Sequence, residues 1–117
     1  MSKYKYFKPA EFNRCTPSCS IEAMDQQFLK ELDVCRHIAG VPFVLLSAYR
    51  SPEHDKLRGR SGVGYHTSGR AVDVKCTNGE DRRAIIEGCL ACGLTFGVYP
   101  TFIHIDNRPK PIAFVSK

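Results

Sequence analysis

The stretch His66-Thr-Ser-Gly-Arg-Ala-Val-Asp73-Val, near the middle of the chain, carries the pattern on which the fold depends. It leaves a glycine-rich loop at residues 51–70 and enters the alternating segment 71–75, which predicts a β-strand. Asp73 stands between two valines, whose side chains point to the opposite face of such a strand. Burying a carboxylate in an apolar strand is costly unless it is paired or bound to a metal. Asp73 is therefore a candidate functional residue.

A second predicted strand, at residues 102–106, has the same character. Its sequence, Phe-Ile-His104-Ile-Asp106, places His104 and Asp106 on one face and two isoleucines on the other. If the two polar faces converge, His66, Asp73 and His104 offer two nitrogen ligands and one oxygen ligand. With water in the fourth position, this is the composition of a catalytic zinc site. A buried histidine–aspartate hydrogen bond that serves only stability would use the same residues, and the spacing alone leaves both interpretations open.

Upstream of these strands the sequence predicts a long helix. Apolar residues recur at helical spacing from Met24 to Ile38, with Ser20 as the expected N-cap and Gly40 as the end. The segment before this helix is expected to be irregular because of its prolines.

A second helix is expected between Asn78, as its N-cap, and Gly93. Short apolar segments predict further strands at 43–46, at 94–99 and, along one edge, at 111–115. The sequence therefore predicts an α+β fold in which two main helices pack on a small, mostly antiparallel sheet. We expect residues 1–117 to form one domain.

The composition restricts the classes of partner. The chain has 117 residues and a formal net charge of +5, which suits an anionic partner such as a cell wall but also an ordinary soluble basic protein. The sequence contains no run of five or more lysines and arginines, so we expect no nucleic-acid-binding tail. It also contains no apolar run that approaches the ~20 residues needed to cross a membrane. No apolar segment follows the basic N-terminus, so we expect no secretory signal and synthesis in the cytoplasm.

The six cysteines allow more than one interpretation. Cys89 and Cys92 lie on the apolar face of the second predicted helix, which favours small buried side chains over metal ligands. Cys15 and Cys19 lie in a polar segment, and the sequence leaves open whether they bind a metal or form a disulfide bond.

Three segments together resemble the zinc D-Ala-D-Ala carboxypeptidase family. Residues 66–74 are similar to its H-x-x-G-x-A-x-D-hydrophobic motif, Leu46-Ser-Ala-Tyr-Arg-Ser-Pro52 to its S-x-x-R-S segment, and residues 97–106 to the strand of its last ligand. The opening, Tyr6-Phe-Lys-Pro-Ala-Glu-Phe12, resembles the start of short members. The family includes D-Ala-D-Ala dipeptidases and phage L-alanyl-D-glutamate endopeptidases, and the Hedgehog signalling domain shares its fold. The resemblance spans nearly the whole chain in the same order.

The resemblance implies that His66, Asp73 and His104 bind Zn²⁺ and that Arg50 contacts the substrate or the developing oxyanion. Family members commonly place an acid or histidine a few residues before the last ligand as general base, and residues 99–103 contain none. Asp106 is the candidate for this catalytic role because it shares a strand face with His104. It could instead orient a metal ligand.

The implied function is zinc-dependent hydrolysis of amide bonds in peptidoglycan stem peptides, by a D,D-carboxypeptidase or an L,D-type endopeptidase. The sequence does not decide which peptide bond is cut, because these activities share the same residues. We expect a monomer without a nucleic-acid partner or membrane insertion, acting at the cell wall after release, as a phage or prophage product would. The alternative is a non-catalytic wall-binding or virion-structural module that keeps the fold, and the absent base motivates it.

Overall fold

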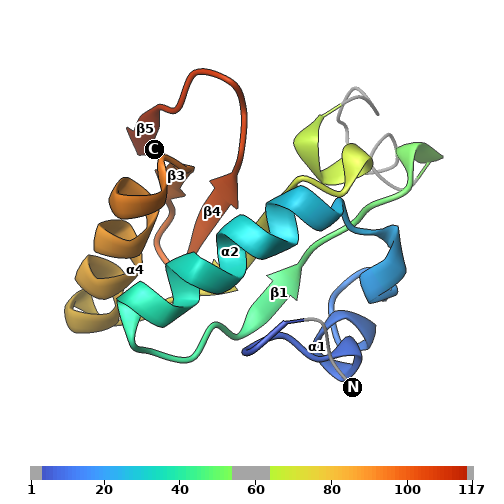
Figure 1. Ribbon diagram of the computed structural model, residues 1–117, viewed down its shortest axis with the longest axis horizontal. Helices are drawn as coiled ribbons and strands as arrows, with labels where there is room; N and C mark the ends of the chain where they lie inside the picture. Colours follow the sequence, from blue (N-terminus) through green and yellow to red (C-terminus); the bar gives the residue numbers. More distant parts are fainter. Residues whose placement is uncertain (1–3, 54–63, 116–117) are drawn as a thin grey trace.

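The computed structural model describes residues 4–53 and 64–115 and confirms the predicted α+β fold (Figure 1). Within the described residues, the strands form one sheet in the order β1-β2-β4-β3-β5. Neighbouring strands are antiparallel, except that β5 runs parallel to β3 along one edge, where the sequence predicted an edge strand. The strands are β1 (Leu45–Ser47), β2 (Ala71–Lys75), β3 (Thr95–Val98), β4 (Phe102–Asp106) and β5 (Ala113–Val115).

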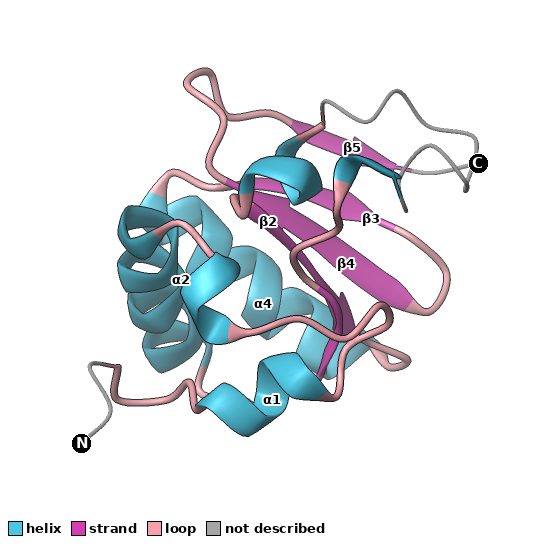
Figure 2. Cartoon of the chain, turned by 90° about the vertical axis from the view of Figure 1, so that its right-hand side faces the viewer, coloured by secondary structure: helices cyan, strands magenta, loops and turns pink. Residues whose placement is uncertain are grey.

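Two long helices, α2 (Gln26–Ala39) and α4 (Gly79–Cys92), pack against each other on one side of the sheet (Figure 2). Both end at a glycine in the left-handed conformation, as predicted. The predicted cap of the second helix is also confirmed, because the Asn78 side chain accepts a hydrogen bond from the Asp81 backbone N–H at 2.8 Å. The helices therefore begin and end where short polar residues and glycines satisfy their terminal groups.

The start of the first long helix differs from the prediction. Ser20 precedes a short 3₁₀ turn, Ile21–Ala23, and Asp25 caps α2 by accepting a hydrogen bond from the Phe28 N–H at 2.9 Å. The predicted cap was wrong because Met24 has an extended backbone conformation, which separates the 3₁₀ turn after Ser20 from α2. The N-terminal segment is also less irregular than expected. A short helix, α1 (Pro9–Asn13), forms with proline at its first position, where no backbone hydrogen bond is lost.

The central strands β2 and β4 separate the core from the candidate site. Their alternate residues Val72, Val74, Ile103 and Ile105 are fully buried against the helices in one apolar cluster. The residues between them lie on the opposite face. The antiparallel register places Asp73 directly opposite His104, so the two polar side chains meet there.

Much of the glycine-rich loop predicted at residues 51–70 lies outside the described residues, but its end forms a 3₁₀ turn, Tyr65–Ser68.

All six cysteines are free thiols, so the structure contains no disulfide clip. Cys89 is buried, with its Sγ 3.9 Å from that of Cys35, whereas Cys92 is partly exposed. Within the described ranges, no helix has the length and apolar character needed to cross a membrane.

Candidate metal centre

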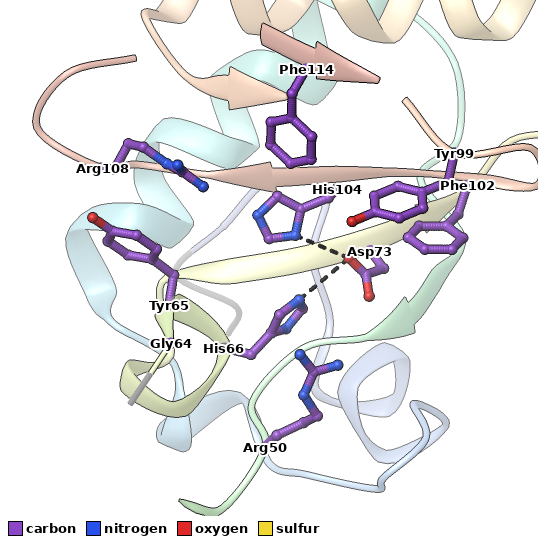
Figure 3. A pocket seen from close by; sticks show the side chains of 10 residues that line it. All are labelled: Arg50, Gly64, Tyr65, His66, Asp73, Tyr99, Phe102, His104, Arg108 and Phe114. Atoms are coloured by element: carbon purple, nitrogen blue, oxygen red, sulfur yellow. Dashed lines mark hydrogen bonds and ion pairs between the residues drawn. The ribbon is translucent and has the colours of Figure 1, made fainter. Parts of the chain in front are cut away.

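The structure brings together the three residues predicted as metal ligands (Figure 3). Asp73 comes from β2, His104 from β4, and His66 from the 3₁₀ turn before β2. One potential ligand atom from each residue lies within 4.8 Å of the others. Gly69 joins the turn to β2 with φ of 71°, and a Cβ there would lie 2.5 Å from the Ala23 carbonyl oxygen. The chain can therefore turn from His66 into the strand only with glycine at this position.

Partners outside the centre fix the tautomer of each histidine. His66 Nδ1 lies 2.7 Å from the backbone carbonyl oxygen of Ala48, which can only accept a hydrogen bond. His104 Nε2 lies 2.7 Å from Asp106 Oδ2. Each of these nitrogens must therefore carry the proton. In the neutral rings, the opposite nitrogens, His66 Nε2 and His104 Nδ1, point lone pairs at the carboxylate of Asp73.

Three hydrogen-bond acceptors face one another in this centre, and a cation between them would stabilise the arrangement. His66 Nε2 lies 3.3 Å and His104 Nδ1 3.2 Å from the same oxygen, Asp73 Oδ1. Tetrahedral zinc with ligand bonds of about 2.0–2.2 Å spaces its ligand atoms about 3.3 Å apart. The distances and the donor types both fit zinc with one position left for water or substrate. Without a metal, protons on the two rings would have to separate these acceptors.

The local electrostatics are consistent with a cation beside Asp73. Burial disfavours the charged carboxylate, but hydrogen bonds from the two imidazoles outweigh burial and hold the pKa of Asp73 well below its usual range. Burial likewise disfavours imidazolium at His104, yet its carboxylate neighbours Asp106 and Asp73 raise the pKa of His104. The carboxylates that favour imidazolium at His104 would likewise favour a metal cation at this position.

Asp106, the predicted general base, lies behind His104. Its side chain is fully buried, and it is absent from the residues that line the pocket over the centre. Its Oδ2 contacts His104 Nε2 and also accepts from Arg108 Nη2 at 2.6 Å. Its Oδ1 accepts from the Arg108 backbone N–H and Nε at 3.0 and 2.9 Å. Burial opposes ionisation, but the Arg108 guanidinium and His104 outweigh it and keep the pKa of Asp106 well below its usual range.

Arg50 lines the same pocket as the three ligands, opposite the side occupied by Arg108 in Figure 3. It is almost fully buried, its Nη1 lies 3.4 Å from Ser47 Oγ, and its backbone N–H donates to the His66 carbonyl at 3.1 Å. The guanidinium is therefore held next to the candidate metal position. A fixed guanidinium there can bind a carboxylate or an oxyanion.

The wall on another side of the pocket is aromatic. Phe114, from the edge strand β5, lies over His104 with ring centroids 5.9 Å apart (Figure 3). Gly97 in β3 makes this possible, because a Cβ there would lie 2.2 Å from the Phe114 ring. Tyr99 and Phe102, at either side of the β3–β4 turn, complete the wall.

The centre also depends on residues that the sequence motifs did not reveal. Ala48 acts through a backbone carbonyl, so its side chain gives no signal. Phe114 was expected only as part of an edge strand. Arg108 lies two residues beyond the end of β4, where strand alternation no longer predicts the direction of a side chain.

Two imidazoles and one carboxylate beneath an open pocket are the ligand chemistry of mononuclear zinc hydrolases. A family model described as Peptidase M15 matches residues 5–106, and the chain therefore belongs to the M15 peptidases, which are zinc peptidases. This agrees with the family resemblance carried by the sequence motifs. Among proteins with curated descriptions, none matches the chain.

Proposed function

We propose that the chain is a zinc-dependent peptidase that hydrolyses amide bonds in peptidoglycan stem peptides. The observation that carries the proposal is the pair of fixed imidazole tautomers, His66 and His104, whose free nitrogens face one oxygen of Asp73 at zinc-ligand spacing. Membership of the M15 peptidases supports the reaction class.

In this proposal, residues in and around the pocket bind the metal, orient a ligand and bind the substrate. Zinc bound by His66, Asp73 and His104 would supply Lewis acidity and a water whose pKa is lowered toward ~7. The Ala48 carbonyl holds the ring of His66 in one orientation, so that its Nε2 remains available as a ligand. Arg50 binds the substrate carboxylate or the carbonyl oxygen as it gains charge.

For Asp106 we favour the orienting role over the role of general base. Its oxygens are engaged by His104 and Arg108, and it does not line the pocket. A general base must lie within hydrogen-bond reach of the proton that it abstracts, directly or through one water. Asp106 would instead fix the His104 ring, and the pair with Arg108 would keep the carboxylate charged.

The substrate class rests on charge and on Arg50. Stem peptides end in carboxylates, which a guanidinium held in the pocket can bind with two parallel hydrogen bonds. The net charge of +5 would favour association with an anionic wall. Action at the wall after release from the cell is part of this proposal.

Digestion of purified peptidoglycan tests the proposal. The zinc-loaded chain should release stem-peptide fragments whose masses identify the cut bond. His66→Ala should abolish release, whereas His37→Ala, which removes a histidine bonded to Tyr6 outside the pocket, should leave it intact. Full activity of the wild-type chain after chelation and dialysis would contradict the proposal.

A non-catalytic wall-binding or virion-structural module remains the second candidate. The observation in its favour is that, among the described pocket-lining residues, Asp73 is the sole carboxylate and no histidine accompanies the two ligands. A protein that binds zinc and wall fragments but turns over none of them would support this alternative. Measuring zinc content and fragment release separately distinguishes the two.

A further inference from the structure

Amide hydrolysis develops negative charge on the scissile carbonyl oxygen, which a hydrogen-bond donor in the pocket over the candidate metal centre can stabilise. Once these ligands are set aside, the polar side chains lining its described part are two arginines, Arg50 and Arg108, and two tyrosines, Tyr65 and Tyr99. Arg108 is already engaged by Asp106. Among the described lining residues, a neutral O–H donor to the substrate would therefore come from one of the two tyrosines.

The orientation of the two phenols separates them. In Figure 3 the hydroxyl of Tyr99 points toward the middle of the pocket, between His104 and Asp73. The hydroxyl of Tyr65 points away from the three ligands, and its ring lies against the guanidinium of Arg108 at 5.1 Å. Tyr99 is thus the tyrosine whose hydroxyl faces the candidate metal ligands.

The Tyr99 ring is held firmly in this position. It stacks on Phe102 with centroids 4.2 Å apart and planes inclined by 11°, and it meets Phe114 edge-on at 6.3 Å. The Tyr99 backbone N–H donates to the Phe102 carbonyl at 2.9 Å, which closes the turn between β3 and β4. Pro100 further restricts the backbone of Tyr99 to extended conformations. A donor fixed before the reaction needs no reorganisation as charge develops.

We propose that Tyr99 is a catalytic residue whose hydroxyl donates a hydrogen bond to the scissile carbonyl oxygen as that oxygen becomes negative. The inference rests on the proposed peptidase function and deepens it. The attacking water oxygen bonds to the carbonyl carbon, and the π pair moves onto the carbonyl oxygen. The pair then returns to reform C=O while the C–N bond breaks, and its electrons leave with the nitrogen. The two water protons end on the amine and on the product carboxyl group. Tyr99 keeps its own proton throughout.

Tyr99→Phe is the direct test, because it removes the hydroxyl and keeps the stacked ring. We expect kcat on a zinc-dependent stem-peptide substrate to fall by about 10²–10³-fold, the usual effect of losing one oxyanion donor. KM, zinc content and melting temperature should stay close to wild type. Tyr6→Phe is the matched control, since its hydroxyl contacts His37 Nδ1 at 2.6 Å and Tyr6 does not line this pocket.

A binding measurement provides a readout independent of turnover. A phosphinate analogue of the stem peptide carries a tetrahedral centre with an oxygen in the position of the oxyanion. Its affinity for Tyr99→Phe should fall by about the same factor as kcat, whereas the affinity of the product peptide should not change.

Different results would overturn the role of Tyr99 and the peptidase function. Tyr99→Phe with wild-type kcat and wild-type phosphinate affinity overturns the role of Tyr99 alone. Loss of zinc or of thermal stability together with activity would make Tyr99 a structural residue and would also overturn the proposal. A wild-type chain that binds zinc and cleaves no stem peptide overturns the peptidase function, and the role of Tyr99 with it.

Discussion

Replacing Asp106 by asparagine separates its two possible roles. The buried carboxylate offers one oxygen to both His104 and Arg108, and the other oxygen to Arg108 alone. Asparagine keeps the shape but has a single oxygen. Either His104 Nε2 or the Arg108 side chain must then face an NH₂ group, which cannot accept a hydrogen bond. Because the amide carries no charge, the His104 ring loses a charge-assisted hydrogen bond in both cases, and in one of them it loses its acceptor altogether.

The expected magnitude follows from the position of Asp106 one ring away from the metal. Loss of a partner that orients a ligand typically weakens metal affinity by about 10–100-fold. This factor corresponds to about 1.4–2.7 kcal/mol. At a fixed free zinc concentration, the stabilisation that zinc provides should fall by a similar amount. For a domain of this size, the gain in melting temperature on adding zinc should shrink by roughly 5–10 °C.

The assay is a competition titration with a zinc chelator, together with thermal unfolding at matched free zinc. Glu87→Gln is the control, because Glu87 is an exposed carboxylate paired with Arg83 on α4, away from the centre. If zinc affinity and the zinc-induced gain in melting temperature are unchanged in Asp106→Asn while kcat collapses, our reasoning is refuted. Asp106 would then act as the general base that the sequence predicted.

Three further perturbations test other parts of the centre. Because its two carboxylate partners raise the pKa of His104, its proton stabilises the metal-free protein fully below about pH 6.5, and this contribution is lost as pH rises through the raised pKa. Zinc must displace that proton, so the zinc-induced gain in melting temperature should be larger at pH 8 than at pH 6, and equal gains would contradict this. Arg50→Lys should lower kcat/KM by about 10–100-fold at unchanged zinc content, since a lysine cannot bind the substrate with a fork of two hydrogen bonds. Gly97→Ala should displace the Phe114 ring, raise KM and cost about 1–3 kcal/mol in unfolding experiments. Gly79→Ala, where a Cβ meets nothing within 4 Å, serves as its control.

Much of the fold was predictable because local rules and tertiary packing agree. Alternating residues in β2 and β4 predicted both strands and their polar face, and Asn78, Gly40 and Gly93 marked helix ends that the structure confirms. The prediction failed at Ser20, because Asp25, five residues further along the chain, caps the helix instead. Only packing decides which of two possible caps starts the helix, and the Asp25 N–H bond to the Gly69 carbonyl, 2.9 Å long, links that choice to the turn that carries His66.

The sequence by itself determined which side chains face away from the core, since strand alternation placed Asp73 and His104 opposite the buried valines and isoleucines. It could not determine the protonation pattern of the centre. The tautomer of His66 depends on a backbone carbonyl 18 residues away, and the role of Asp106 depends on which oxygens Arg108 occupies. Only the tertiary structure decides these contacts, because hydrogen bonds between distant segments depend on where the whole chain places each donor and acceptor.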